Sequence, residues 1–314
     1  MNRLLSIKDL SIYRTRLMGC AMLNIMILHA FYVINPDVSQ LTRTIVEHIV
    51  RLCFVPTFVL LSGFGLAFSF HHTPSLRLYF LKRIKRVLIP FIIISFPFLL
   101  YEDIYVHSDV LDFFLDITTL RFWIEGNHLG MWFISTILFL YIIFPVLYKI
   151  IFDGNPKGYL IALTACILLD IIISLLFPIW YKSVKLAFNL IPIFVIGVFL
   201  AKKTIQKEEL KIDFFILFIM LFILNRVLKN YGDFNYWYPI LGIIIYIQIY
   251  KLFNTKIWKF VEFTGQYTLE LYLLHMFLIC ITQPNFLPKY TYIVFGYYII
   301  SFALCKPIHQ CIKT

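Results

Sequence analysis

The sequence contains few charged residues for its length. Only 14% of its 314 residues are Asp, Glu, Lys or Arg, whereas 61% are hydrophobic and 18% are aromatic. A soluble globular domain has about 45–50% apolar and roughly 25% charged residues. The chain departs from that composition in both directions. This excludes an ordinary soluble domain and indicates that much of the apolar surface faces lipid.

The sequence also lacks paired cysteines, internal repeats and low-complexity tracts. Its cysteines stand singly, mostly inside apolar runs, and have no spacing typical of a zinc or redox motif. We interpret them as small buried residues and expect no metal site. No change in composition marks a second domain, so we expect one domain over residues 1–314. The six cysteines are Cys20, Cys53, Cys166, Cys280, Cys305 and Cys311.

Long apolar runs are what the sequence has instead. About 20 mostly apolar residues cross a ~30 Å hydrocarbon layer as a helix. Such runs predict an all-α fold, a polytopic transmembrane bundle of about ten helices. The first run has no cleavage pattern at its end, so we interpret it as a retained helix rather than a signal peptide. The predicted spans are 17–35, 45–70, 87–106, 128–149, 158–178, 184–201, 212–229, 236–254, 261–282 and 291–311.

The distribution of basic residues predicts the orientation. If the N-terminus is cytoplasmic, most of the 28 lysines and arginines fall on the cytoplasmic side. The positive-inside rule therefore places both termini in the cytoplasm and makes the chain a multi-pass protein of the cell membrane, with lipid as its partner. Because the net charge of +11 has this explanation, we expect no nucleic-acid partner. The oligomeric state stays open.

One predicted outer loop, over residues 102–127, is acidic. We interpret it as a solvated loop or a short surface helix. A lid over an outward-facing acceptor site is the alternative. Its acidic residues are Glu102, Asp103, Asp109, Asp112, Asp116 and Glu125.

Three ionisable residues lie within predicted spans near the outer side. Such residues are costly in a membrane and usually face the bundle interior or a water-filled cavity. His29 lies ~9 Å below the outer edge of the first helix at a rise of 1.5 Å per residue. Arg51 is predicted at a similar depth in the second helix, and His275 in the outer half of a later one. The same positions also suit a structural histidine bonded inside the bundle and an arginine paired with Glu47.

Six tracts occur in an order that is similar to one family of membrane enzymes. They are the basic start of the first helix with His29 near its far end, PTFVLLSGFGL at 56–66, LKRIKRVLIPF at 81–91, WFISTILFLYIIFP at 132–145, FVIGVFLAKK at 194–203 and VEFTGQYTLELYLLH at 261–275. Together they resemble the acyltransferase-3 family of integral-membrane O-acyltransferases. Some members have arginine where Met18 precedes Gly19, so either Arg14 or Arg16 is expected to take its place.

The resemblance implies a catalytic site on the outer half of the bundle. A histidine takes the proton of an acceptor hydroxyl, and an arginine stabilises the oxyanion on the acyl carbonyl. We assign these roles to His29, Arg51 and His275, without deciding which histidine is the base. Asp170 and Glu270 are further intramembrane acids, and either can orient a histidine or make a structural hydrogen bond.

The resemblance also implies a donor site on the cytoplasmic side, with acetyl-coenzyme A as the acyl donor. Basic residues bind its phosphates, and small residues let its pantetheine arm pass. Lipid anchoring by the basic residues and close helix packing by the small ones are the alternatives. The residues assigned to donor binding are Arg14, Arg16, Ser62, Gly63, Arg83 and Arg86.

The function implied is transfer of an acetyl or longer acyl group from cytoplasmic acyl-coenzyme A to a carbohydrate hydroxyl, outside the cell or on a lipid carrier. The alternative is a transporter or flippase of a glycan or lipid, without acyl-transfer chemistry. Binding of acetyl-coenzyme A discriminates between the two, because a glycan carrier has no reason to bind it. The sequence does not identify the glycan.

Overall fold

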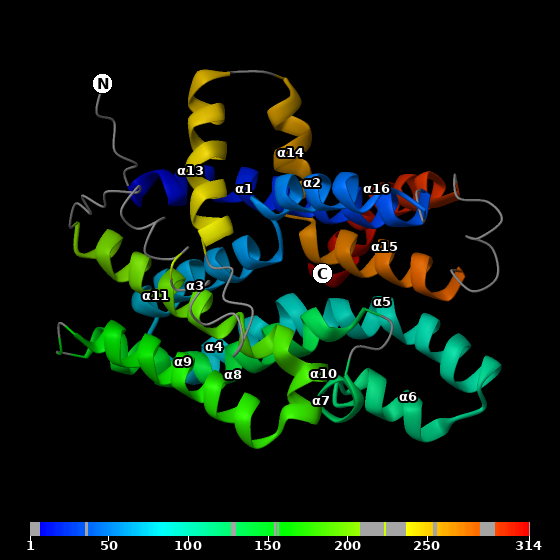
Figure 1. Cartoon of the computed structure of the whole chain (residues 1–314), viewed down its shortest axis with the longest axis horizontal. Coiled ribbons are helices and arrows are strands. Elements are labelled where there is room, and N and C mark those ends of the chain that lie inside the picture. Colours follow the sequence, from blue (N-terminus) through cyan, green and yellow to red (C-terminus); the bar gives the residue numbers. More distant parts are fainter. Residues whose placement is uncertain are drawn as a thin grey trace.

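The computed structural model describes residues 7–34, 37–126, 130–153, 155, 157–207, 223, 237–253, 256–282 and 293–313, and the described part of the chain contains helices and no strand. Figure 1 shows them as one bundle. The helices are α1 (Ile7–Ile34), α2 (Gln40–Arg51), α3 (Val55–His72), α4 (Leu76–Arg83), η1 (Ile84–Leu88), α5 (Ile89–Leu99), η2 (Leu100–Val106), α6 (Val110–Ile117), α7 (Arg121–Glu125), α8 (Trp132–Phe152), α9 (Gly158–Leu176), α10 (Pro178–Phe188), α11 (Ile191–Ile205), α13 (Trp237–Leu252), α14 (Ile257–Gln266), α15 (Thr268–Thr282) and α16 (Ile293–Lys313).

The prediction of an all-α polytopic bundle is confirmed. Within the described residues, six helical stretches are long and apolar enough to cross a membrane, and two shorter apolar helices accompany them at Pro239–Leu252 and Thr268–Cys280. The predicted span 212–229 lies outside the described residues. The six stretches are Lys8–Ile34, Gln40–His72, Leu76–Val106, Trp132–Phe152, Gly158–Leu176 and Pro178–Ile205.

The predicted span 45–70 falls within the apolar stretch Gln40–His72, but this stretch is not one continuous helix. The helix breaks after Arg51, and α3 begins at Val55 with Pro56 in its first turn, where proline is well tolerated. Asn24 of α1 stabilises the break, because its side-chain amide donates hydrogen bonds to the carbonyls of Val50 (3.4 Å) and Cys53 (2.9 Å). Carbonyls at a helix end need such partners inside a membrane.

Other predicted spans differ in their bounds. The span predicted at 87–106 begins eleven residues earlier, at Leu76, and contains the π-helical stretches η1 and η2. The spans predicted at 184–201 and 261–282 are each divided between two helices, α10 with α11 and α14 with α15. Hydropathy reports the apolar length of a segment but not a break inside it.

Glycines bring two pairs of helices into close contact. A Cβ atom at Gly63 of α3 would lie 2.4 Å from the carbonyl oxygen of Phe194, and one at Gly197 of α11 would lie 2.0 Å from that of Leu60. Any side chain there would force α3 and α11 apart. Gly19 of α1 approaches α14 in the same way: a Cβ atom at Gly19 would lie 1.9 Å from the carbonyl oxygen of Val261.

α1 is the central element of the bundle. It contacts α2, α3, α11, α13, α14, α15 and α16. In Figure 1, α13 and α14 stand across α1, whereas α15 lies between α1 and α5. Different faces of α1 therefore pack against different helices. One face lines the cavity described below, and another forms one wall of an apolar groove.

Candidate active site

A cavity lies among α1, α3, α8, α15 and the segment around η1. Its empty volume is about 980 Å³, including the part open to solvent. Methionine, isoleucine and phenylalanine side chains form much of its wall. The polar residues that line it are Arg14, Ser62, Ser69, Arg83, Arg86, Tyr141, Thr268 and Tyr272.

Three arginines gather at this cavity from three parts of the chain: Arg14 from α1, Arg83 from the end of α4 and Arg86 from η1. Arg14 Nε donates a hydrogen bond to the Leu61 carbonyl at 3.3 Å, and its guanidinium lies against Gly65, where a Cβ would be 2.8 Å from Nη2. None of the described residues lining the cavity is Asp or Glu. The arrangement suits an anion.

Arg83 supports this interpretation. Its guanidinium lies over the rings of Tyr79 (5.8 Å) and Tyr141 (5.7 Å). Its Nε is buried and has no hydrogen-bond partner among the described residues. A buried donor without an acceptor costs free energy, so a bound anion would compensate it.

The π-helical segment η1 determines which of its side chains face the cavity. Its backbone widens to an i→i+5 hydrogen bond, in which Ile89 N–H donates to the Ile84 carbonyl. π-Bulges inside α-helices are frequent at functional sites because they rotate side chains relative to a regular helix. Arg86 and Val87 line the cavity from this segment, whereas Lys85 does not.

One face of α1 leads from the arginines to His29. Arg14, Met18, Met22 and Ile25 all line the cavity, at the spacing of three and four residues that marks a single helical face. His29 continues this stripe four residues after Ile25. At 1.5 Å per residue, Arg14 and His29 lie ~22 Å apart along α1.

His29 and His275 lie in direct contact. His29 Nδ1 is 3.1 Å from His275 Nε2, and the two rings stack with centroids 5.3 Å apart. His275 Nδ1 is 2.6 Å from the Leu271 carbonyl oxygen, which can only accept a hydrogen. The Nδ1 of His275 therefore carries the hydrogen, and its Nε2 accepts one from His29 Nδ1. The Nε2 of His29 is then the nitrogen with a lone pair.

Two tyrosines pack against His275. Tyr272 lines the cavity, and its ring meets His275 edge-on at 5.9 Å. Tyr298 of α16 meets His275 from another side at 6.0 Å and donates a hydrogen bond to the Met26 carbonyl at 2.5 Å. His275 is fully buried, whereas His29 is partly exposed. Of the two histidines, His29 is the more accessible to a substrate.

Of the remaining residues assigned to the donor site, one lines the cavity and two do not. Ser62 lines the cavity together with Arg14. Gly63 faces α11, where it allows the close helix packing described above. Arg16 lies away from the cavity and forms an ion pair with Glu262 at 2.7 Å. Of the two arginines that the sequence left open, Arg14 is the one beside Met18 on the cavity wall.

Arg51 ends α2 and forms an ion pair with Glu47 at 2.9 Å. Its side chain is 41% exposed. Glu47 also accepts a hydrogen bond from Tyr32 of α1, so the pair connects α2 to the C-terminal end of α1. In the part of the chain that the structure describes, the ion pair and hydrogen bonds of Arg51 go to Glu47 and not to His29.

The variant Arg51→Lys tests a direct role of this residue. Lysine keeps the charge that pairs with Glu47 but loses the forked donor geometry that a carbonyl oxygen would use. Because the structure shows the pair, we expect Arg51→Lys to keep most of the rate of acyl transfer that the family resemblance implies. A fall to a small fraction of that rate, in protein present at the normal level, would show that Arg51 contacts a substrate directly and is not only the partner of Glu47.

The comparison with protein families shows the family of the chain. The model described as an acyltransferase domain, that of the acyltransferase-3 family, matches residues 17–309. The chain belongs to the acyltransferase-3 family. It is therefore a membrane acyltransferase. No curated protein and no solved structure matches the chain.

The sequence analysis missed two features of this acyltransferase-3 protein: the partner of Glu270 and the place of Tyr272 beside His275. Glu270 accepts from a histidine, but from His309 of α16 at 2.5 Å rather than from His275. Tyr272 was also missed, although a signal existed. Thr268, Tyr272 and His275 are spaced four and three residues apart and so share one face of α15.

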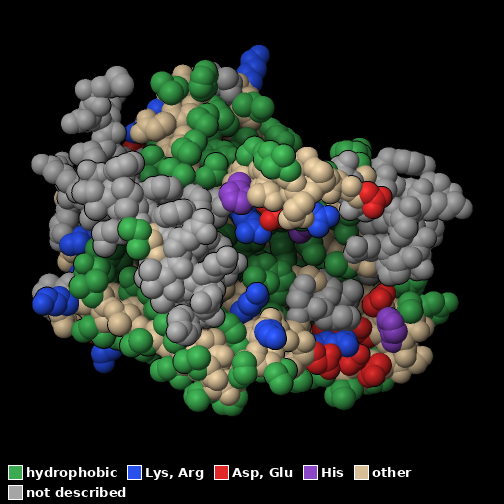
Figure 2. Space-filling model, viewed as in Figure 1, with side chains coloured by type: hydrophobic (Ala, Val, Ile, Leu, Met, Phe, Trp, Pro, Cys, Tyr) green, Lys and Arg blue, Asp and Glu red, His purple; other side chains and the backbone are tan. Residues whose placement is uncertain are grey.

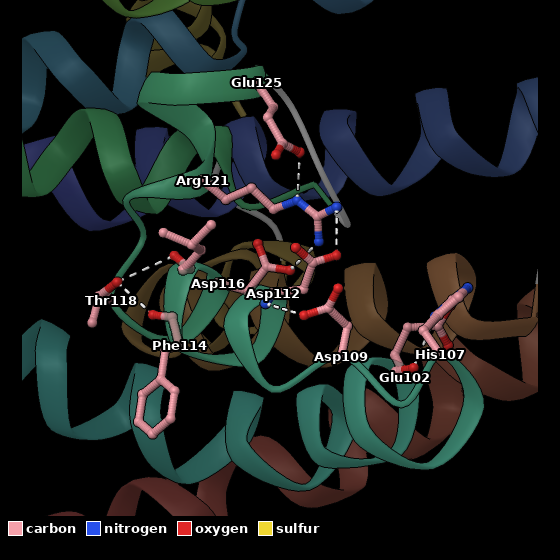
Figure 3. A network of polar contacts seen from close by, with 10 residues as sticks. Glu102, His107, Asp109, Asp112, Phe114, Asp116, Thr118, Arg121 and Glu125 are labelled. Atoms are coloured by element: carbon pink, nitrogen blue, oxygen red, sulfur yellow. Dashed lines mark hydrogen bonds and ion pairs between the residues drawn. The ribbon is translucent and has the colours of Figure 1, made fainter.

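The acidic segment that the sequence predicted as an outer loop contains η2, α6 and α7, and an ion-pair network, drawn in Figure 3, connects its acidic residues to Arg121. Arg121 binds Asp112 (2.9 Å), Asp116 (3.2 Å) and Glu125 (2.8 Å), and Asp109 caps the start of α6. Burial lowers the pKa of Arg121, but its bonds to these carboxylates outweigh burial, and the net pKa is raised. Figure 2 shows acidic side chains in red gathered around blue basic atoms in this part of the surface. These contacts indicate a structural role.

Proposed function

We propose that this acyltransferase-3 protein transfers an acyl group, acetyl in the first instance, from cytoplasmic acyl-coenzyme A to a hydroxyl of a cell-surface or lipid-linked carbohydrate of the cell envelope. The observation that carries the proposal is the single face of α1 that joins the arginine-lined cavity to the histidine pair. A donor with charged phosphates at one end and a thioester at the other needs such a connection.

In this proposal the phosphates of the donor bind Arg14, Arg83 and Arg86. Charge-assisted hydrogen bonds to phosphate are stronger than neutral ones, and Arg83 Nε supplies a buried donor that otherwise has no partner. The pantetheine arm lies along Met18, Met22 and Ile25, which brings the thioester toward His29. The positive-inside orientation places the arginines on the cytoplasmic side, where acyl-coenzyme A is made.

The chemical step follows from the hydrogen-bonded order of the histidines. His29 Nε2 accepts the proton of the acceptor hydroxyl as its oxygen attacks the thioester carbonyl carbon. A C–O bond forms, the C–S bond breaks, and the proton passes to the departing thiolate of coenzyme A. The products are the O-acyl ester and free coenzyme A.

His275 acts through His29 in this scheme. Its Nε2 accepts from His29 Nδ1, which fixes the ring and keeps the lone pair of His29 on the nitrogen facing the acceptor. His275 is a positioning residue, and the Leu271 carbonyl holds it in turn. Such a partner typically determines which ring nitrogen carries the hydrogen.

The proposal is tested with membranes that contain the protein and matched membranes that lack it. Both receive acetyl-coenzyme A with a radiolabelled acetyl group. We expect alkali-labile label in carbohydrate only when the protein is present, because O-acetyl esters are cleaved by mild base. Equal labelling in both preparations, together with no binding of acetyl-coenzyme A by the purified protein, would contradict the proposal.

A further inference from the structure

A second, wholly apolar groove lies on another face of α1. Five residues of α1 between Leu23 and Phe31 form one wall, and Phe295, Tyr298 and Phe302 of α16 form the other. The groove has an empty volume of about 600 Å³, including the part open to the surroundings. Ile27 and Phe295 are 53% and 54% exposed, so the groove opens on the outer surface of the bundle.

Tyr298 connects this groove to the histidine pair. Its ring forms part of the groove and meets His275 edge-on at 6.0 Å, and its hydroxyl bonds to Met26 of the opposite wall. The cavity that receives the donor occupies the face of α1 with Arg14 and Ile25. The groove and the cavity thus lie on two faces of one helix. His29 continues the cavity face, whereas His275 contacts Tyr298 of the groove.

The depth of the groove matches a hydrocarbon chain in the outer half of the membrane. Its wall on α1 extends from Leu23 to Phe31, ~12 Å along the helix axis. It begins six residues on the inner side of His29 and ends two residues on the outer side. A chain lying in the groove would run from the bilayer interior to the level of the reacting nitrogen.

Charge at the outer end of the groove suits a phosphate. The Phe31 ring packs edge-on against Tyr32 at 5.8 Å, and the Arg43 guanidinium lies 5.5 Å from the Tyr32 ring centroid. Tyr32 also binds Glu47, the partner of Arg51. The cluster of Tyr32, Arg43, Glu47 and Arg51 therefore holds two guanidiniums and one carboxylate.

We propose that this groove binds the hydrocarbon chain of the acceptor, and that the acceptor is a carbohydrate joined to a lipid through phosphate. The inference rests on the proposed function and deepens it, because it chooses between free and lipid-linked carbohydrate. The hydrocarbon chain of the acceptor lies between α1 and α16. Its phosphate faces Arg43 and Arg51, and a hydroxyl of its sugar reaches His29.

The test uses the full-length protein in native membranes, with acetyl-coenzyme A radiolabelled in its acetyl group as the probe. The variants Ile27→Asn and Phe295→Asn place an amide in the groove. Ile172→Asn is the matched control, because Ile172 is 49% exposed on α9, away from the groove. The label is separated into an organic extract, which takes up lipid-linked product, and a water-soluble fraction.

We expect alkali-labile label in the organic extract with the unchanged protein. An amide in place of an apolar contact should lower the initial rate about tenfold in each groove variant. The control should keep its rate, and all three variants should bind acetyl-coenzyme A normally. That last measurement separates a groove effect from loss of the folded protein.

The other outcomes contradict either the inference about the groove or the proposed function. Label found only in the water-soluble fraction, with normal groove variants, would overturn the inference and leave acyl transfer intact. An equal loss in Ile172→Asn would also overturn it, because the groove would then be ordinary lipid-facing surface. No label transfer by the unchanged protein would instead contradict the proposed function.

Discussion

Replacing His29 with alanine is expected to lower acyl transfer by about 10²–10⁴-fold, the range that general acid–base catalysis typically contributes. His29 Nε2 is the nitrogen left with a lone pair once His275 and the Leu271 carbonyl have fixed the other positions. The side chain is only partly buried, so its loss should cost little helix packing. The measurement is the rate of O-acetyl transfer per amount of protein in the membrane.

Two further variants show whether the effect is specific to His29. His71→Ala is the control, because His71 is exposed and bonds to the Tyr148 hydroxyl instead. It should keep the normal rate. His275→Gln should lose less activity than His275→Ala, because a glutamine carbonyl can replace Nε2 as the acceptor for His29 Nδ1. Normal transfer by His29→Ala, with His275→Ala inactive, would exchange the roles of the two histidines.

The double variant Arg83→Ala, Arg86→Ala is expected to raise the KM for acetyl-coenzyme A by about 10–100-fold, with a smaller change in acceptor KM. Both residues line the cavity, and Arg83 Nε is buried without a hydrogen-bond partner among the described residues. If these guanidiniums bind the phosphates of the donor, their removal weakens binding of the donor more than binding of the acceptor. Donor affinity is measured directly by binding of acetyl-coenzyme A to the purified protein.

Lys85→Ala provides the control for this experiment. Lys85 belongs to the same basic segment and lies in η1 beside Arg86, but it is exposed and does not line the cavity. It should bind donor normally while removing a positive charge from the side that the positive-inside rule predicts to be cytoplasmic. Unchanged donor affinity in the double variant, combined with a disturbed orientation of the chain, would make the cluster a topology signal only.

The sequence by itself determined the class of fold and the family. Apolar runs of about 20 residues and scarce charges leave a chain few options other than transmembrane helices, because lipid offers no partners for exposed backbone groups. The order of the motifs that contain His29, Ser62, Arg83 and His275 then indicated the acyltransferase-3 family. These signals are local in the chain, so they can be read without coordinates.

The tertiary structure decided which of the candidate residues meet. His29 and His275 are 246 residues apart, and no spacing rule predicts that their rings lie in contact. Arg14 and Arg16 are two residues apart, yet one lines the cavity and the other pairs with Glu262. Adjacent positions on a helix point about 100° apart, so only the packing of neighbouring helices determines which of them faces a site.

The break between α2 and α3 shows the same limit. Hydropathy joined 45–70 into one span because the average hydropathy of the stretch is high despite Glu47, His48 and Arg51, and Pro56 alone did not fix where the helix would stop. Asn24, on another helix, supplies the hydrogen bonds that stabilise the broken end. Composition and periodicity determine that a segment lies in the membrane. The position of a helix end and the partner of a charged group depend on contacts from distant parts of the chain, which only the tertiary structure provides.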